Sequence, residues 1–130
     1  MRSPSSILSR RWASTLATAA LLLALGGRAP ALAHAIVTES TPAAGATATG
    51  PDLSIELRFN SRIDHRRSRL TLYPPDGNPR ALAQRPDVAP AVVVARATGL
   101  AAGAYRLRWQ VLAVDGHITR GDIPFKVVVP

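Results

Sequence analysis

Hydrophobic and polar side chains alternate with a period of two through much of the chain after residue 34. The clearest example runs from residue 53 to 59, where Leu and Ile positions and Phe59 alternate with Ser, Glu and Arg. Residues 105–111 repeat the alternation, with Tyr105 and Trp109 on the apolar side. This period predicts strands that bury one face, and we expect Trp109 to fill the core between two sheets.

Shorter apolar runs predict the remaining strands. They are Ala35–Thr38, a segment that includes Ile63, Leu70 and Leu72, the continuous run Ala91–Ala97, and a closing strand over Ile123–Val129. Gly, Pro, Asp and Asn separate them, and the Asp76-Gly77 step predicts a hairpin turn. Residues 81–90 are weakly patterned and predict a loop or edge. Six or seven short strands in about a hundred residues predict an all-β protein, an antiparallel Greek-key β-sandwich.

The first 33 residues have the pattern of a secretory signal peptide. Arg2, Arg10 and Arg11 precede an apolar run from residue 12 to 27, and Ala31-Leu32-Ala33 is a small-x-small cleavage sequence. We expect cleavage after Ala33, export to the periplasm and one mature domain over residues 34–130. A retained N-terminal anchor is the alternative, and Arg10-Arg11 leaves the twin-arginine route open beside the general secretory one.

Composition narrows the chemistry of this domain. Four of the 16 basic residues lie in residues 1–33, which leaves 12 against 8 acidic ones and a net charge of +4. A small excess spread over many arginines is typical of a solvated surface and does not predict nucleic-acid binding. The chain has no cysteine, and its single methionine is Met1. Thiolate sites, cysteine nucleophiles and a thioether site for Cu(I) are therefore excluded from the mature domain.

Cleavage after Ala33 would make His34 the first residue of the mature protein. Its free α-amine and its imidazole Nδ1 could then close a chelate ring around a metal ion. Two further candidate ligands, Asp115 and His117, flank a glycine, and residues two apart in an extended segment point to the same side. Nitrogen and oxygen donors of this kind favour Cu(II). The remaining histidine, His65, lies in a basic stretch and is interpreted as an exposed surface residue.

The mature chain resembles the CopC family of periplasmic copper-resistance and copper-trafficking proteins. The resemblance covers nearly all of residues 34–130. It is carried by His34-Ala35, by 40–46 (Ser-Thr-Pro-Ala-Ala-Gly-Ala), by 57–60 (Leu-Arg-Phe-Asn), by 103–109 (Gly-Ala-Tyr-Arg-Leu-Arg-Trp), and by Asp115-Gly116-His117 with Gly121 and Phe125. It implies a cupredoxin-like or immunoglobulin-like sandwich that binds Cu(II) through His34, Asp115 and His117. Ser61 replaces an acidic residue common in the family, and the family's methionine-rich Cu(I) site is missing.

We therefore expect a non-enzymatic, monomeric Cu(II)-binding protein for copper buffering, resistance or delivery. Its partners would be the copper ion and, as one candidate acceptor, a membrane copper-transport protein, without nucleic-acid binding or peripheral membrane association. Two alternatives stay open. An amine and two imidazoles also resemble the histidine brace of oxidative polysaccharide-cleaving enzymes, and the domain could be an immunoglobulin-like interaction module whose histidines hold no physiological metal.

Overall fold

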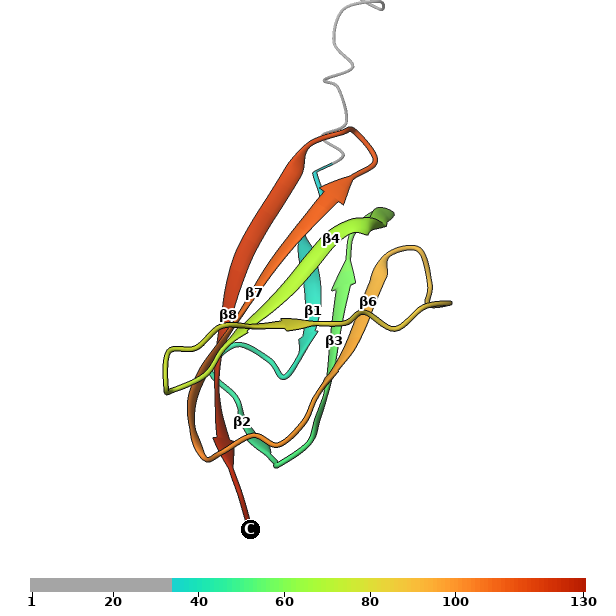
Figure 1. Ribbon diagram of the computed structural model, residues 1–130. Coiled ribbons are helices and arrows are strands. Elements are labelled where there is room, and N and C mark those ends of the chain that lie inside the picture. Colours follow the sequence, from blue (N-terminus) through green and yellow to red (C-terminus); the bar gives the residue numbers. More distant parts are fainter. Residues whose placement is uncertain (1–33) are drawn as a thin grey trace, which may run out of the picture. The chain divides into compact units, whose positions relative to one another are not determined.

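A computed structural model describes residues 34–130, which form two β-sheets packed face to face (Figure 1). The predicted signal peptide, residues 1–33, and its cleavage point lie outside the described residues. In the smaller sheet the order is β1 (Val37–Thr41), β3 (Leu53–Phe59) and β6 (Val92–Ala97), all antiparallel. Within residues 34–130, no helix has the length and apolar character needed to span a membrane.

The larger sheet has five strands in the order β2, β8, β7, β4 and β5. They are β2 (Thr47–Thr49), β4 (Ile63–Tyr73), β5 (Arg80–Leu82), β7 (Gly103–Ala113) and β8 (Ile118–Val128). The pairs β4–β5, β4–β7 and β7–β8 are antiparallel, whereas β2 runs parallel to β8. The chain passes between the sheets repeatedly, as a Greek-key sandwich requires.

The predicted β-sandwich is confirmed, but it has eight strands instead of six or seven. The two extra strands, β2 and β5, are three residues long, too short to show a period. The closing strand also begins at Ile118, five residues before the predicted start. Its inward positions there are Thr119 and Gly121, which are not large apolar residues, so the alternation is invisible in the sequence.

The side chains that alternate in the sequence meet in the core between the sheets. Trp109 of β7 packs edge-to-face on Phe59 of β3, with ring centroids 5.4 Å apart. Trp109 therefore contacts the opposite sheet, as predicted. Gly121, its partner on β8, makes room for the indole, because a Cβ there would lie 2.7 Å from Cζ2 of Trp109.

The interpretation of His65 as an exposed surface residue is wrong. His65 belongs to β4, whose pairing with β7 changes register between Asp64 and Arg69. Such a bulge bends the strand and redirects its side chains. The half-buried His65 ring places Nε2 2.7 Å from the carbonyl oxygen of Val92 on β6, so it connects the two sheets.

Candidate metal centre

The turn between β7 and β8 carries two of the predicted ligands, Asp115 and His117. The backbone N–H of Gly116 donates to the carbonyl of Ala113 (3.0 Å), and that of Ala113 donates to the carbonyl of His117 (2.9 Å). Gly116 has φ +83°, a conformation that costs glycine little because it has no Cβ. The glycine thus lets the hairpin reverse direction within the Asp-Gly-His tripeptide.

The carboxylate of Asp115 lies between the two imidazoles. Its Oδ1 accepts a hydrogen bond from the backbone N–H of His117 (2.9 Å), which fixes the orientation of the side chain. Its Oδ2 lies 3.1 Å from Nδ1 of His117 and 3.5 Å from Nε2 of His34. The carboxylate therefore presents one oxygen to its own turn and the other to the candidate ligands.

Contacts with two other segments hold the beginning of the described chain beside this turn. Ala35 is buried, and its carbonyl accepts a hydrogen bond from Oγ1 of Thr119 (3.0 Å). The N–H of Ile36 donates to Oδ1 of Asn60 (2.8 Å), while the N–H of Asn60 donates to the carbonyl of Ile36 (3.0 Å). Because all three bonds are made by backbone groups within two residues of His34, they fix the backbone from which its side chain extends.

Asn60 and Thr119 are positioning residues that the sequence did not predict. In the sequence, Asn60 is recognisable only as part of a family-like motif, and Thr119 carries no distinguishing signal. Their roles depend on contacts across 24 and 84 positions of the chain, respectively. The one local signal is a polar amide placed directly after an apolar strand.

All three residues predicted as metal ligands come together, although they lie at opposite ends of the domain's sequence. His34, Asp115 and His117 are called the ligand cluster below. Their candidate donor atoms all lie within 4.8 Å of one another, and the two imidazole rings are 4.8 Å apart at 73°. In residues 34–130 this is the one group of three or more potential ligands that is so close.

The distances between the candidate donor atoms fit a small metal ion if the atoms move slightly closer together. Metal–nitrogen and metal–oxygen bonds of about 2.0–2.2 Å place donor atoms roughly 3 Å apart when adjacent and about 4 Å apart when opposite. The separations from Asp115 Oδ2, 3.1 and 3.5 Å, match adjacent positions. The donor set of two imidazoles and a carboxylate suits a borderline divalent ion.

The electrostatics of the cluster favour an ionised carboxylate. The hydrogen bond from the backbone N–H of His117 holds the pKa of the Asp115 carboxyl below its ordinary value of 3.8, against the opposing effect of partial burial. The imidazoles of His117 and His34 act in the same direction as the hydrogen bond. Asp115 therefore carries its negative charge throughout the neutral range, as a metal ligand must.

The three side chains differ in exposure. The side chain of Asp115 is 21% exposed, that of His34 42% and that of His117 68%. The site is thus open on the His117 side. His34 turns Nε2, not Nδ1, toward Asp115, so a chelate through its amine and Nδ1 needs the imidazole to rotate, which its exposure allows.

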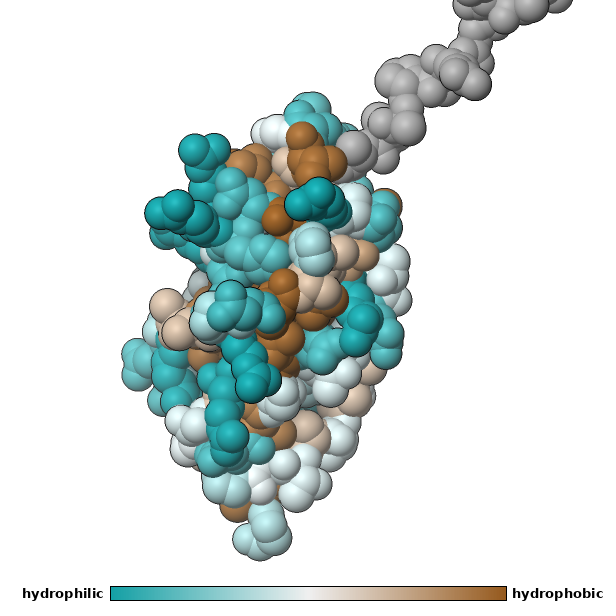
Figure 2. Space-filling view, turned by 90° about the vertical axis from the view of Figure 1, so that its right-hand side faces the viewer, coloured by the Kyte–Doolittle hydropathy of each residue, from teal (hydrophilic) through white to brown (hydrophobic). Residues whose placement is uncertain are grey.

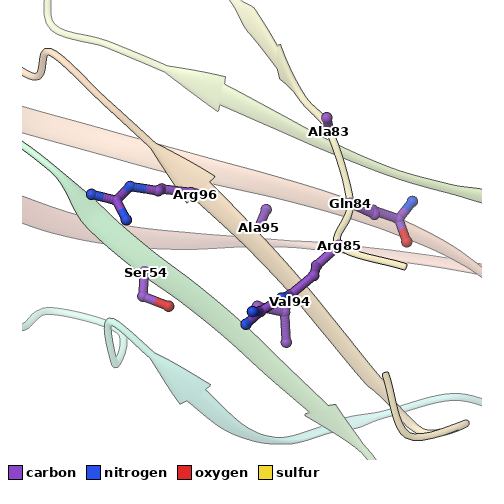
Figure 3. Close-up of a pocket in the computed structure, with 7 residues that line it drawn as sticks. All are labelled: Ser54, Ala83, Gln84, Arg85, Val94, Ala95 and Arg96. Carbon is purple, nitrogen blue, oxygen red and sulfur yellow. The ribbon is translucent and has the colours of Figure 1, made fainter. Parts of the chain in front are cut away.

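The ligand cluster lies outside two hollows of the described surface. One hollow, of about 400 Å³, is lined by β3, β6 and residues 83–85 (Figure 3). It presents two arginines, Arg85 and Arg96, and Arg96 pairs with Asp52 outside the hollow's lining (3.2 Å). Since the hollow contains none of the three predicted ligands, it has no part in metal binding by the ligand cluster.

Comparison with known proteins places the fold and the turn in one family. The sequence model of the CopC domain matches residues 37–128. The chain belongs to the CopC family. Asp115 and His117 lie within the matched residues, whereas His34 lies just before them. The chain is also 32% identical to protein YobA of Escherichia coli strain K12 over 98 residues, 73% of this chain and 79% of YobA.

Two solved structures of the CopC family resemble the sandwich. CopC from Methylosinus trichosporium OB3b matches with a TM-score of 0.66 and 24% identity over 74% of this chain and 95% of its own, a likeness of fold. PcoC, a methionine-rich copper resistance protein from Escherichia coli, matches with a TM-score of 0.60 and 27% identity over 74% of this chain and all of its own. Unlike a methionine-rich protein, this chain has only Met1.

Proposed function

We propose that the protein is an exported, monomeric Cu(II)-binding protein that buffers copper or passes it to an acceptor such as a membrane copper-transport protein. Copper is its cargo, and His34, Asp115 and His117 hold it. The observation that carries the proposal is the convergence of the His34 and His117 imidazoles on Oδ2 of Asp115. Membership of the CopC family supports it, as does the resemblance to PcoC, a copper resistance protein.

The donor atoms select the oxidation state in this proposal. Imidazole nitrogen and carboxylate oxygen favour Cu(II), whereas Cu(I) prefers cysteine or methionine sulfur. Residues 34–130 contain neither cysteine nor methionine. We therefore propose Cu(II) alone as the cargo, with no exchange between a Cu(II) and a Cu(I) site within the protein.

Removal of residues 1–33 belongs to the proposal. Cleavage after Ala33 frees the amine of His34 and adds a nitrogen donor to the cluster. The metal then replaces protons on the amine and the imidazoles, so the affinity falls as the pH drops below neutrality. The uncleaved chain lacks the amine donor and binds copper weakly.

The deciding experiment combines N-terminal sequencing of the exported protein with Cu(II) titration and electron paramagnetic resonance. We expect a chain that begins at His34, and hyperfine splitting from several nitrogens. A variant with one alanine inserted before His34 should bind at least tenfold more weakly. Equal affinity for the inserted variant would exclude the amine as a ligand.

Matched substitutions test the two remaining ligands. His117→Gln and Asp115→Asn should weaken Cu(II) binding, and His65→Gln and Asp122→Asn are their controls because those side chains lie outside the cluster. If the exported wild-type protein binds no Cu(II), the domain is an interaction module and the proposal fails.

The proposal also includes the absence of enzymatic activity. Asp115 would supply a donor atom to the ion, whereas an oxidative copper enzyme needs an open position there for oxygen. The copper-loaded protein should therefore release no oxidised sugars from chitin or cellulose in the presence of ascorbate and hydrogen peroxide. Product formation that requires His34 would assign the protein to the oxidative enzymes instead.

A further inference from the structure

Exposed hydrophobic residues lie next to the members of the ligand cluster along the chain. The exposed large hydrophobic residues of the described chain are Ile36 (60%), Val114 (61%), Ile118 (54%), Val128 (47%) and Val129 (43%). The first three flank the ligands, since Ile36 follows His34 by two residues, Val114 precedes Asp115 and Ile118 follows His117. Consecutive Cα atoms are about 3.8 Å apart, so each lies within roughly 8 Å of a ligand's Cα.

Ile36, Val114 and Ile118 belong to one end of the sandwich, which is called the site end. It comprises residues 34–36, 60–69 and 112–120, joined by the pairs Ile63–Ala113, Asp64–Leu112 and Leu112–Ile118 and by the bonds of Asn60 to Ile36. The β7–β8 hairpin and the beginning of the described chain lie together there, away from the C-terminus (Figure 1). Brown hydrophobic surface is exposed at this end beside strongly hydrophilic residues (Figure 2).

The site end is also strongly cationic. Its basic side chains are Arg62, Arg66, Arg67, Arg69 and Arg120. Its carboxylates are Asp64, which lies 3.9 Å from Arg67, and Asp115 of the ligand cluster. Arg69 and Arg120 flank Gln110 on neighbouring strands and therefore project from the same face of the larger sheet. The surface around the ligands thus combines apolar side chains with an excess of guanidinium groups.

This combination selects the kind of partner. A second copy would bring the same arginines against these ones, and like charges in contact disfavour association. Membrane-interface segments use Trp and Tyr as anchors, and the site end has no aromatic residue other than histidine. A protein with an apolar contact area bordered by carboxylates complements both the charge and the hydrophobicity.

We propose that the site end is a docking surface for an acidic protein acceptor, which contacts Ile36, Val114 and Ile118 and pairs with the surrounding arginines. The inference rests on the proposed copper function and adds the chemistry of the acceptor to it. Docking on this surface places the acceptor's ligands beside His117, the most exposed member of the cluster. Each bond from copper to this protein is then replaced by a bond to the acceptor, and the metal stays Cu(II). The protons that the acceptor's nitrogens release pass to the freed amine of His34, to the freed imidazoles and to the buffer.

Synthetic acceptor peptides test the proposal on the exported protein. Each begins with Gly-Gly-His, whose nitrogens bind Cu(II), and continues with leucines interleaved with either glutamates or lysines. Copper transfer from the loaded protein is followed by the visible absorbance of the peptide complex. At low salt we expect the acidic peptide to be at least tenfold faster than the basic one, because steering raises association rates 10- to 1000-fold. The difference should shrink at about 0.5 M salt as charges are screened.

Matched variants locate the surface. Arg62→Glu with Arg120→Glu, and separately Val114→Ser with Ile118→Ser, should slow transfer to the acidic peptide at least fivefold without altering the Cu(II) affinity. Two control variants carry the same kinds of change away from the site end. They are Arg80→Glu with Lys126→Glu, and Val128→Ser with Val129→Ser. Both controls should leave the transfer rate unchanged. Equal rates for both peptides, or equal effects of site-end and control variants, overturn the docking surface.

Two further outcomes would also overturn it. One is that the wild-type protein cosediments with phosphatidylglycerol-containing vesicles and the Val114→Ser, Ile118→Ser variant does not. That result would assign the surface to membrane binding. The other is a dimer in sedimentation velocity that the same variant dissociates. A wild-type protein that binds no Cu(II) contradicts the proposed function itself, and the affinity titration identifies that case before any transfer is measured.

Discussion

The centre of the sandwich and its site end are held together by different kinds of interaction. Around Trp109, apolar side chains from both sheets exclude water, and the indole, Phe59 and Gly121 fit without spare space. Around Asp115, the imidazole side chains of His34 and His117 stay 42% and 68% exposed, the carboxylate itself stays 21% exposed, and only a few hydrogen bonds hold the three side chains. The first region contributes stability through burial, and the second contributes a geometry for binding.

This contrast predicts that stability and the proposed metal binding can be changed separately. Replacing a core residue removes buried contacts and affects the whole fold. Replacing an exposed ligand removes a donor atom and leaves the core intact. Only residues that connect the two regions, Asn60 and Thr119 above all, should affect both properties.

The largest expected effect follows Trp109→Ala in the core. Truncation of a buried aromatic residue costs about 3–5 kcal/mol, a large part of the 5–15 kcal/mol typical of a domain. Urea unfolding should show a large fall in the midpoint. His117→Ala is the matched control from the site end and should keep the wild-type midpoint in the absence of copper.

The next effect comes from Gly121→Ala, which places a methyl group against the Trp109 ring. Overpacking of this kind costs about 1–3 kcal/mol. Trp109→Phe should relieve the clash, so the double variant should lose less stability than the two single losses together. Strict additivity in urea unfolding would show that the indole does not oppose the added methyl group.

A smaller effect, on both properties, is expected for Asn60→Ala. The change removes the acceptor of the Ile36 N–H and costs about 0.5–1.5 kcal/mol. It also frees the segment that carries His34, so Cu(II) should bind several-fold more weakly although no ligand is removed. Thr119→Val should act in the same way. Unchanged copper affinity in both variants would mean that His34 does not depend on these bonds.

The smallest effect concerns Asp122, on the outer face of the larger sheet. Bidentate hydrogen bonds from Arg108 (2.9 and 3.1 Å) lower the pKa of its carboxyl below 3.8, and Arg106 adds to the effect. A lowered pKa stabilises the fold above the ordinary value, and the contribution disappears as the pH falls through the lowered value. Asp122→Asn should therefore lower the Tm by a few degrees at most at pH 7. The two Tm values should converge as the pH falls through the lowered pKa of Asp122.

Much of the sandwich could be predicted because its core strands carry their own signal. The alternation in residues 53–59 reports directly which side chains are buried, and the pattern predicted β3 at its observed bounds. The signal fails where the inward positions are not apolar, as at Thr119 and Gly121 in the first half of β8. It also fails at His65, whose burial depends on a bulge that only pairing with β7 defines.

The members of the ligand cluster could be chosen from the sequence because histidines are few and Asp-Gly-His is a compact tripeptide. What could not be predicted was how His34 is positioned. That depends on Asn60 and Thr119, whose bonds form only after β3, β8 and the first residues of the domain are brought together. Such long-range hydrogen bonds leave no local pattern at Thr119, and at Asn60 they leave only a polar amide after an apolar strand.

The bond between Thr119 and Ala35 joins positions 84 residues apart, and the ligand cluster, from His34 to His117, spans nearly the same length of chain. An ion that links His34 to the β7–β8 hairpin would close a loop containing nearly the whole domain. Closure of a loop of that length removes conformational entropy from the unfolded state, on the order of 4 kcal/mol for a permanent link. Copper would then act as a reversible cross-link, and the domain should resist unfolding and proteolysis most strongly when it carries its cargo.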